Sequence, residues 1–302
     1  MSNFILLAVC FIAGLIINRH KQLPLNAHKV ISMIVVNVTL PSMALLYLHK
    51  LEWTTAVCAA IAMPWGIFTL AALTFFFIGG KLGWSKETVG AVTLVTGLGN
   101  TSFVGAPIVE AIYGSSALPI VMAIDQAGSY LVLCTLGVLI AVHCSGGTPS
   151  WKQITLKIIT YPPFVAMAIA IALIPVAYPE AVSAVLQRLA DMTAPLVLLS
   201  IGMQMSFKEI NVNRNPLVVG LSFKLLACPV VVFLAYLFLG VEMGANEHVT
   251  LLESAMGPSA GAAVVAMQHN LNPKLVTLIV GIGIPLSILT APAVNFLATK
   301  LV

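Results

Sequence analysis

A stretch rich in glycine and proline interrupts an otherwise apolar run in the first half of the sequence. It extends from Gly97 to Pro107 and contains Asn100, Thr101 and Gly105. Glycine weakens a helix, and proline removes a backbone donor and collides with the preceding turn. The freed backbone N–H and C=O groups are tolerated within a membrane only against protein or a water-filled cavity. The stretch therefore predicts an interrupted membrane helix that borders such a cavity.

The second half of the sequence contains a similar stretch, MGPSAG, from Met256 to Gly261. Two interrupted helices at corresponding positions of two halves are typical of the binding site of a secondary transporter. The alternative is that glycine and proline only permit close helix packing or a kink. The expected binding residues are Asn100, Thr101, Gly105, Pro107, Gly257, Pro258 and Ser259.

Interrupted helices also predict the charge of the ligand. Each half-helix begins with unpaired N–H groups and a partial positive charge, and both features favour an anion. We therefore expect the ligand to be a small organic anion, bound where the two interruptions meet.

Two charged residues lie deep within apolar stretches, Asp125 and Lys224. A charge at the middle of a bilayer costs about 2.5–3.5 kcal/mol on insertion scales, so it must be paired, hydrated or functional. Lys224 could extend its ammonium group to the membrane surface, whereas Asp125 could cap an unwound segment or carry a proton. A direct pair between the two is a further alternative. Glu110, Asp191 and Glu253 lie nearer the ends of their apolar stretches, where a solvated rim position is expected.

The remaining titratable residues predict neither catalysis nor metal binding. The histidines lie near the ends of apolar stretches and lack the i, i+4 partner that a zinc site on a helix uses. The sequence also lacks a nucleophile elbow, a phosphate-binding loop and an HExxH motif. We expect no enzymatic activity, no metal site and no cofactor, and coupling to H⁺ or Na⁺ stays open. A membrane sensor or channel is an alternative to a carrier.

The composition places these residues in a membrane. Of the 302 residues, 60% are hydrophobic and only 8% are charged, against about 25% charged in an ordinary soluble domain. The net charge of +4 is scattered, so no nucleic-acid partner is expected. A helix needs about 20 apolar residues to cross a bilayer. The sequence predicts an all-α integral membrane protein of about ten spans, at roughly 3–18, 30–48, 54–78, 88–113, 117–142, 155–174, 181–205, 215–240, 249–269 and 274–299.

The basic residues predict the orientation. With ten spans, three basic residues fall on one side, Lys50, Arg188 and Lys300, and Lys224 lies within a span. An excess of Lys and Arg marks the cytoplasmic side. We therefore expect a multi-pass protein of the cell (inner) membrane with both termini on the non-cytoplasmic side. The basic residues on the expected cytoplasmic side are Arg19, Lys21, Lys29, Lys81, Lys86, Lys152, Lys157, Lys208, Arg214 and Lys274.

The spans divide into two similar halves at the polar joint from Ser145 to Ser150. Thr39-Leu40-Pro41 in the second span recurs as Thr193-Ala194-Pro195 in the seventh. Because five spans is an odd number, two similar halves must lie in the membrane upside down to one another, as in many secondary transporters. We expect one five-helix repeat over residues 1–144 and the other over 151–302.

The same residues resemble the auxin efflux carrier family, which includes bacterial organic-acid carriers and the plant PIN-type auxin exporters. Asn100-Thr101-x-x-x-Gly105-x-Pro107 is similar to the N-T-x-x-x-G-x-P motif of the fourth helix of the family. The segment from Lys224 to Pro229 resembles the K-x-x-x-x-P motif of its helix 8, and Pro258 lies where helix 9 has its crossover proline.

This resemblance implies a scaffold of spans 1, 2, 6 and 7 and a mobile transport domain of spans 3–5 and 8–10. Helices 4 and 9 would cross at Pro107 and Pro258, the transport domain would move like an elevator, and a homodimer would form through the scaffold. The implied substrates are mono- or dicarboxylates that resemble malonate or malate, or auxin-like compounds. Since the joint from Ser145 to Ser150 is short, a bacterial-type organic-acid carrier fits better than a plant exporter. A sodium-coupled symporter of the bile-acid type is the alternative within transport.

Overall fold

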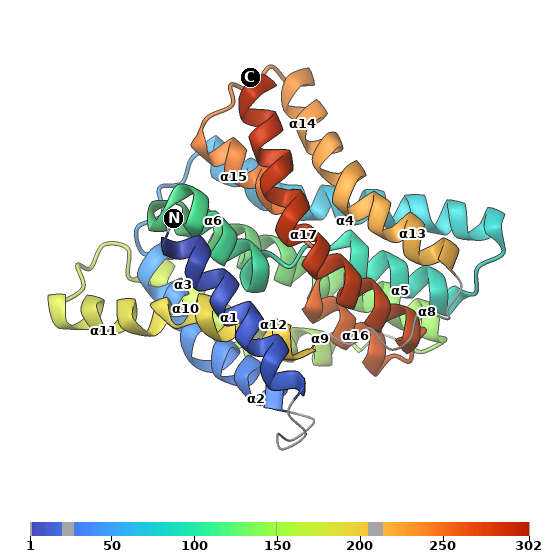
Figure 1. Ribbon diagram of the computed structural model, residues 1–302, viewed down its shortest axis with the longest axis horizontal. Coiled ribbons are helices and arrows are strands. Elements are labelled where there is room, and N and C mark those ends of the chain that lie inside the picture. The colour runs from blue at the N-terminus through green and yellow to red at the C-terminus, as the bar shows by residue number, and fades with distance from the viewer. Residues whose placement is uncertain (1, 20–26, 149, 205–213, 302) are drawn as a thin grey trace.

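The computed structural model describes residues 2–19, 27–148, 150–204 and 214–301. Lys21, Lys208 and Pro149, which entered the arguments about orientation and halves, lie outside these ranges. Within the described ranges, helices are the only regular elements apart from one isolated β-bridge (Figure 1). The predicted all-α fold is therefore confirmed.

The first half of the chain forms a series of helices with short wide π-helical turns between them and one tighter 3-10 turn, η3; both kinds are labelled η. The N-terminal cap of the helix that leads to the first interruption is Ser85, whose hydroxyl accepts a hydrogen bond from the Thr88 N–H at 3.2 Å. The elements are α1 (Ser2–Arg19), α2 (Ala27–Ile34), η1 (Val35–Thr39), α3 (Leu40–Leu48), α4 (Thr55–Leu82), α5 (Lys86–Gly97), η2 (Thr101–Gly105), α6 (Ala106–Tyr113), η3 (Ser115–Ala117), α7 (Leu118–Ala123), η4 (Ile124–Tyr130), η5 (Leu133–Gly137) and α8 (Val138–Ser145).

The second half continues in the same manner. Its elements are α9 (Trp151–Ile159), α10 (Pro162–Ala172), α11 (Glu180–Asp191), α12 (Thr193–Gln204), α13 (Arg214–Ser222), η6 (Phe223–Ala227), α14 (Cys228–Phe238), α15 (Ala245–Ser254), α16 (Ala260–Gln268) and α17 (Pro273–Leu301). The C-terminal helix α17 runs along α13, α15 and α16.

Three of the wide turns have a common cause in the sequence. In each, the residue before a proline donates its N–H to the carbonyl oxygen five positions back instead of four. The proline ring collides with the carbonyl four positions before it, and a wider turn relieves the collision. These turns are η1 before Pro41, η2 before Pro107 and η6 before Pro229. Proline spacing thus places Thr101 and Lys224 in locally opened helices.

The helices form two groups. Helix α1 packs against α12, α12 against α2, and α3 against α10 and α11; these helices lie together on the lower left of Figure 1. Gly14 of α1 and Gly202 of α12 meet so closely that a Cβ on either would lie 2.9 Å from the Cα of the other. The second group has α5 at its centre, surrounded by α4, α8, α13, α16 and α17.

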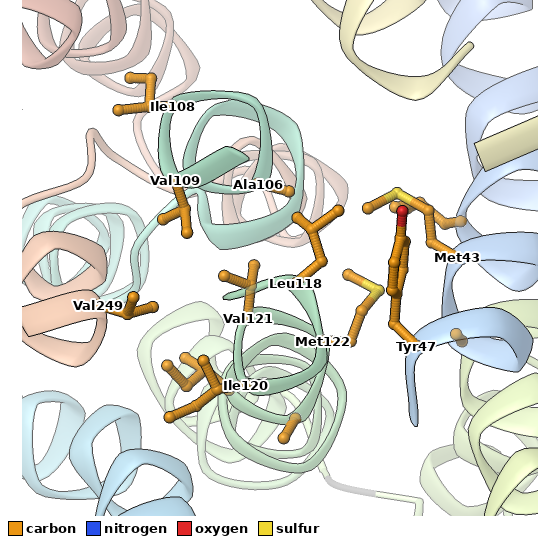
Figure 2. Packing of buried hydrophobic residues seen from close by; sticks show 14 of the residues in the cluster. Met43, Tyr47, Ala106, Ile108, Val109, Leu118, Ile120, Val121, Met122 and Val249 are labelled. Atoms are coloured by element: carbon orange, nitrogen blue, oxygen red, sulfur yellow. The ribbon is translucent and has the colours of Figure 1, made fainter. Parts of the chain in front are cut away.

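The two groups meet at α7, which packs against α3 of the first group and α4 of the second. Met43 and Tyr47 of α3 face Leu118 and Met122 of α7, with Ala106 of α6 beside them (Figure 2). Apolar contacts of this kind are non-directional. They hold the two groups together but, unlike hydrogen bonds, they do not fix one relative position.

Six helical segments of the described chain are long and apolar enough to cross a membrane, and a seventh results if α9 and α10, bent by 62° at their junction, count as one span. Of the expected ten spans, the three others correspond to α1 and to the two helices that the interruptions divide into short halves. The total of ten, the inverted repeat and the boundaries at 1–144 and 151–302 stay predictions.

Candidate functional site

The two interruptions predicted from glycine and proline lie against each other. Helix α5 ends at Gly97 and α15 ends at Ser254, and the chain is unwound over 98–100 and 255–259. We call these two unwound segments together the crossing. Gly99 and Pro258 form an antiparallel β-bridge there. The Asn100 N–H donates to the Gly257 carbonyl oxygen at 2.8 Å.

A second set of backbone bonds completes the crossing. The Ser259 N–H donates to the carbonyl oxygens of Val95 at 3.0 Å and Leu98 at 3.2 Å. Backbone groups that each interruption frees are thus satisfied by the other one, as a buried position requires. A Cβ on Gly257 would lie 2.6 Å from the Ser287 hydroxyl, so this position has room for glycine alone.

Asp125 belongs to η4, which lies beside the crossing. Its carboxylate accepts hydrogen bonds from the Thr101 hydroxyl and from the Gln126 side-chain amide, each at 2.5 Å. The Ser129 hydroxyl lies 3.4 Å from that of Thr101. Asp125 is 7% exposed. It therefore ties η4 to the first turn after the interruption.

Lys224 enters the crossing from η6. It is 2% exposed, and its ammonium group donates to the Ser254 carbonyl oxygen at 3.1 Å. A Cβ on Gly99 would lie 3.3 Å from the Lys224 Nζ, so a side chain at this glycine would crowd the ammonium group. Lys224 therefore stays inside the protein rather than extending to the surface, and it bonds to the end of α15 rather than to Asp125.

The expectation that Glu253 is a solvated rim residue is wrong. Glu253 is 0% exposed, and its carboxylate lies directly against Gly105, where a Cβ would overlap it. The error has a structural cause: α15 ends at Ser254, so Glu253 belongs to the inner end of a half-helix and not to the outer end of a whole one. Of the two other expected rim residues, Glu110 is half-buried and Asp191 is exposed.

Several polar atoms at the crossing are buried without a hydrogen-bond partner in the structure. They are the Asn100 Nδ2, the Gln126 Oε1 and both carboxyl oxygens of Glu253. A buried polar group without a partner is costly and rare, so these atoms are candidates to bind a proton, a water or a ligand. Amide donors and carboxyl acceptors are both present, so this cluster can receive ligands of more than one kind.

A small cavity lies at the crossing. It gives a water-sized sphere about 10 Å³ of space, which is about enough for one water molecule. We call it the crossing cavity, and its walls are Met63, Pro64, Ile67, Gly97, Gly99, Thr101, Ser129, Lys224 and Glu253. Its floor on α4 is apolar, and its polar wall contains both signs of charge.

A second cavity of similar size lies where α3, α6, α11 and α12 meet. Pro107 lines this cavity rather than the crossing cavity, together with Glu110 and Asp191. The other expected site residues, namely Asn100, Thr101, Gly105, Gly257, Pro258, Ser259, Asp125 and Lys224, gather at the crossing. In the described part of the chain, no group of three or more His, Cys, Asp or Glu side chains could hold a metal ion.

The half-helices after the two interruptions begin at the crossing. One starts at Thr101, and the other is α16, whose N-terminal Ser259 hydroxyl accepts from the Ala262 N–H at 3.2 Å. Helix N-termini carry partial positive charge, and the Lys224 ammonium group adds a full one. This arrangement can attract an anion to the centre of a helical membrane protein, and interrupted helices that meet in this way are a feature of membrane carriers.

Comparison with known proteins agrees with that class. Residues 1–294 match the family model described as membrane transport protein. The chain belongs to this family, the auxin efflux carrier family that its motifs resemble. It is similar to an uncharacterised transporter of Methanothermobacter thermautotrophicus, with 26% identity over 269 residues that cover 86% of this chain and 85% of the relative. An uncharacterised transporter of Methanocaldococcus jannaschii is 23% identical over 257 residues, which cover 82% of each chain. The protein is thus a multi-pass membrane transport protein.

Proposed function

We propose that the chain is a secondary carrier that moves a small organic anion, a mono- or dicarboxylate, across the cell (inner) membrane by alternating access. The observation that carries this proposal is the hydrogen bond from the Asn100 N–H to the Gly257 carbonyl, which joins the two interrupted helices. Lys224 supplies a buried positive charge beside that bond, and the unpartnered Asn100 amide supplies a donor. A carboxylate is the ligand that complements these groups.

The proposed movement is of the elevator type. Spans 1, 2, 6 and 7 would form the static scaffold, and spans 3–5 and 8–10 would carry the crossing across the membrane. The apolar interface of Met43 and Tyr47 with Leu118 and Met122 supports this division, because apolar contacts are non-directional (Figure 2). The hydrogen bond from the Tyr130 hydroxyl to the Lys157 carbonyl oxygen at 2.8 Å joins spans 5 and 6, and it would break during the movement. A homodimer through the scaffold and termini on the non-cytoplasmic side belong to the same proposal.

The test is substrate exchange in proteoliposomes. Vesicles that contain the purified protein and an unlabelled carboxylate are placed in labelled malonate, malate, succinate or lactate. A carrier accumulates label transiently by saturable exchange, whereas a channel only equilibrates it. Uptake of a large amphipathic acid that depends on sodium would instead indicate a symporter of the bile-acid type. If only cations or neutral solutes compete for transport, the proposed anion specificity is wrong.

A further inference from the structure

Glu253 is the carboxyl group at the crossing that receives no hydrogen bond. Both of its carboxyl oxygens are buried and without a hydrogen-bond partner. An ionised carboxylate in such a place is strongly disfavoured, because neither water nor a donor replaces its hydration. Asp125 differs in this respect, since Thr101 and Gln126 donate to its two oxygens. A bound proton removes the negative charge of Glu253, and with it the cost of burying that charge.

The charged groups around Glu253 lead to the same assignment. Asp125 of η4 and Lys224 of η6 act on it electrostatically, and Cys228 acts on Lys224. Two carboxyl groups, Asp125 and Glu253, thus share the crossing with one ammonium group, that of Lys224, and hydrogen bonds stabilise the charge of Asp125 alone. An ionised Glu253 therefore gives the crossing a net negative charge, which repels an arriving anion. A protonated Glu253 leaves it neutral and able to accept one.

The crossing cavity connects Glu253 to possible proton partners. Glu253, Lys224, Thr101 and Ser129 all line it, and its volume of about 10 Å³ suits one water molecule. One water can relay a proton between these groups. A proton needs one acceptor oxygen, whereas a metal cation needs several ligands, and no group of three or more His, Cys, Asp or Glu side chains in the described part of the chain could hold one. The geometry thus favours a proton over sodium.

We propose that Glu253 carries the proton that is coupled to anion transport. The carboxylate takes up one proton on the side where the anion binds, crosses the membrane as the neutral acid with the loaded site, and releases the proton on the other side. No covalent bond other than the O–H bond forms or breaks. This inference rests on the proposed function as an anion carrier.

The experiment uses the full chain in proteoliposomes, with labelled malonate, malate, succinate and lactate as probes. Exchange at equal pH inside and outside tests the anion carrier alone. Net uptake is then measured with an inward gradient of one pH unit and, separately, with an inward sodium gradient. With one proton carried by Glu253 for each anion, a gradient of one pH unit supports an accumulation of up to about tenfold for lactate, whose single charge the proton balances, and the sodium gradient has no effect.

The variant Glu253→Gln keeps the size of the side chain but cannot release a proton. We expect the ratio of net uptake with and without the pH gradient to fall from well above one in the wild type to about one. Glu253→Asp retains a titratable carboxyl group and should retain a ratio above one, which separates loss of the proton site from loss of folding. Glu247→Gln is the matched control on the same helix, because a glutamine oxygen can still accept from the Gly244 N–H.

Each outcome bears on the inference. Net uptake that does not respond to the pH gradient, whether or not it responds to sodium, overturns it while the anion carrier stands. A pH response that persists in Glu253→Gln places the proton elsewhere and overturns it too. If none of the acids exchanges at equal pH, the anion carrier itself is rejected, and the proton role falls with it.

Discussion

The backbone N–H of Asn100 donates to the carbonyl oxygen of Gly257 at 2.8 Å, and this bond connects two helices that each stop in the middle of the protein. Next to it, Gly99 pairs with Pro258 as an isolated β-bridge. Two interrupted helices can remain within a membrane because each supplies the backbone partners that the other lost. The side chains of Asp125, Lys224 and Glu253 lie around this pair.

Neutralising Lys224 or Asp125 should damage transport far more than membrane insertion. Lys224→Ala removes the full positive charge placed beside the crossing, and Asp125→Asn removes the negative charge and replaces one of the two acceptor oxygens with a donor. We expect exchange to fall at least about tenfold in each variant, a change equivalent to ~1.4 kcal/mol. Lys274→Met, at an exposed position of α17, is the control. Normal flux in both test variants, measured per inserted protein, contradicts the prediction.

A methyl group at Gly105 should impair the protein. Its Cβ would overlap the Glu253 carboxylate, and overpacking a buried site costs about 1–3 kcal/mol. We therefore expect Gly105→Ala to lower the unfolding temperature and to slow exchange. At Gly66 of α4 a Cβ would have nothing within 4 Å, so Gly66→Ala should leave both quantities within error or raise stability. Equal behaviour of the two variants in thermal unfolding and exchange assays would falsify the assigned contact.

The sequence predicted the crossing because its causes are local. Glycine and proline act on their own turns, and a freed backbone group has few permitted surroundings in a membrane. Pro258 could therefore be placed at an interruption before its partner Gly99 was known. The same logic predicted that Asp125 and Lys224 need compensation, although it did not identify Thr101 and Ser254 as the groups that supply it.

Glu253 shows where sequence reasoning failed. Its position was judged from the ends of one long apolar stretch, but the half-helix from Ala245 to Ser254 moves it from the rim to the centre. A signal was present, since Glu253 precedes Gly257 and Pro258 by about one turn, as a residue at the inner end of a half-helix must. That Gly105 lies against its carboxylate depends on the packing of distant segments and could not be predicted.

Movement of the two helix groups can be tested with a pair of cysteines across their interface. Met43 and Leu118 line the same small cavity from α3 and α7. In a background without the exposed Cys58, oxidation of Met43→Cys/Leu118→Cys should block exchange by at least about tenfold, and reduction should restore it. The elevator proposal is rejected if the cross-linked protein, verified by gel mobility, transports at the uncross-linked rate.

A second cysteine pair provides the control for cross-linking itself. The hydroxyl oxygens of Ser32 and Ser200 lie 3.1 Å apart, and both residues belong to the group of α1, α2 and α12. A disulfide between cysteines at these positions joins helices that are expected to move together. Exchange should therefore be the same before and after oxidation, provided that the same gel assay shows complete cross-linking.

Asn100 offers the most direct test of where the anion binds. Its buried Nδ2 has no acceptor in the structure, so a substrate carboxylate could gain a hydrogen bond there and remove an unsatisfied donor. Asn100→Asp puts a negative charge at this point, whereas Asn100→Ala only removes the donor. We expect the aspartate variant to raise the KM for exchange by more than about tenfold and the alanine variant by less, since repulsion adds to the lost bond.

Because neither change alters the Asn100 N–H that bonds to Gly257, a similar thermal unfolding temperature for both variants assigns the difference in KM to the anion. An unchanged KM in the aspartate variant, with the protein folded, would place the anion away from Asn100 and leave that amide a structural role only.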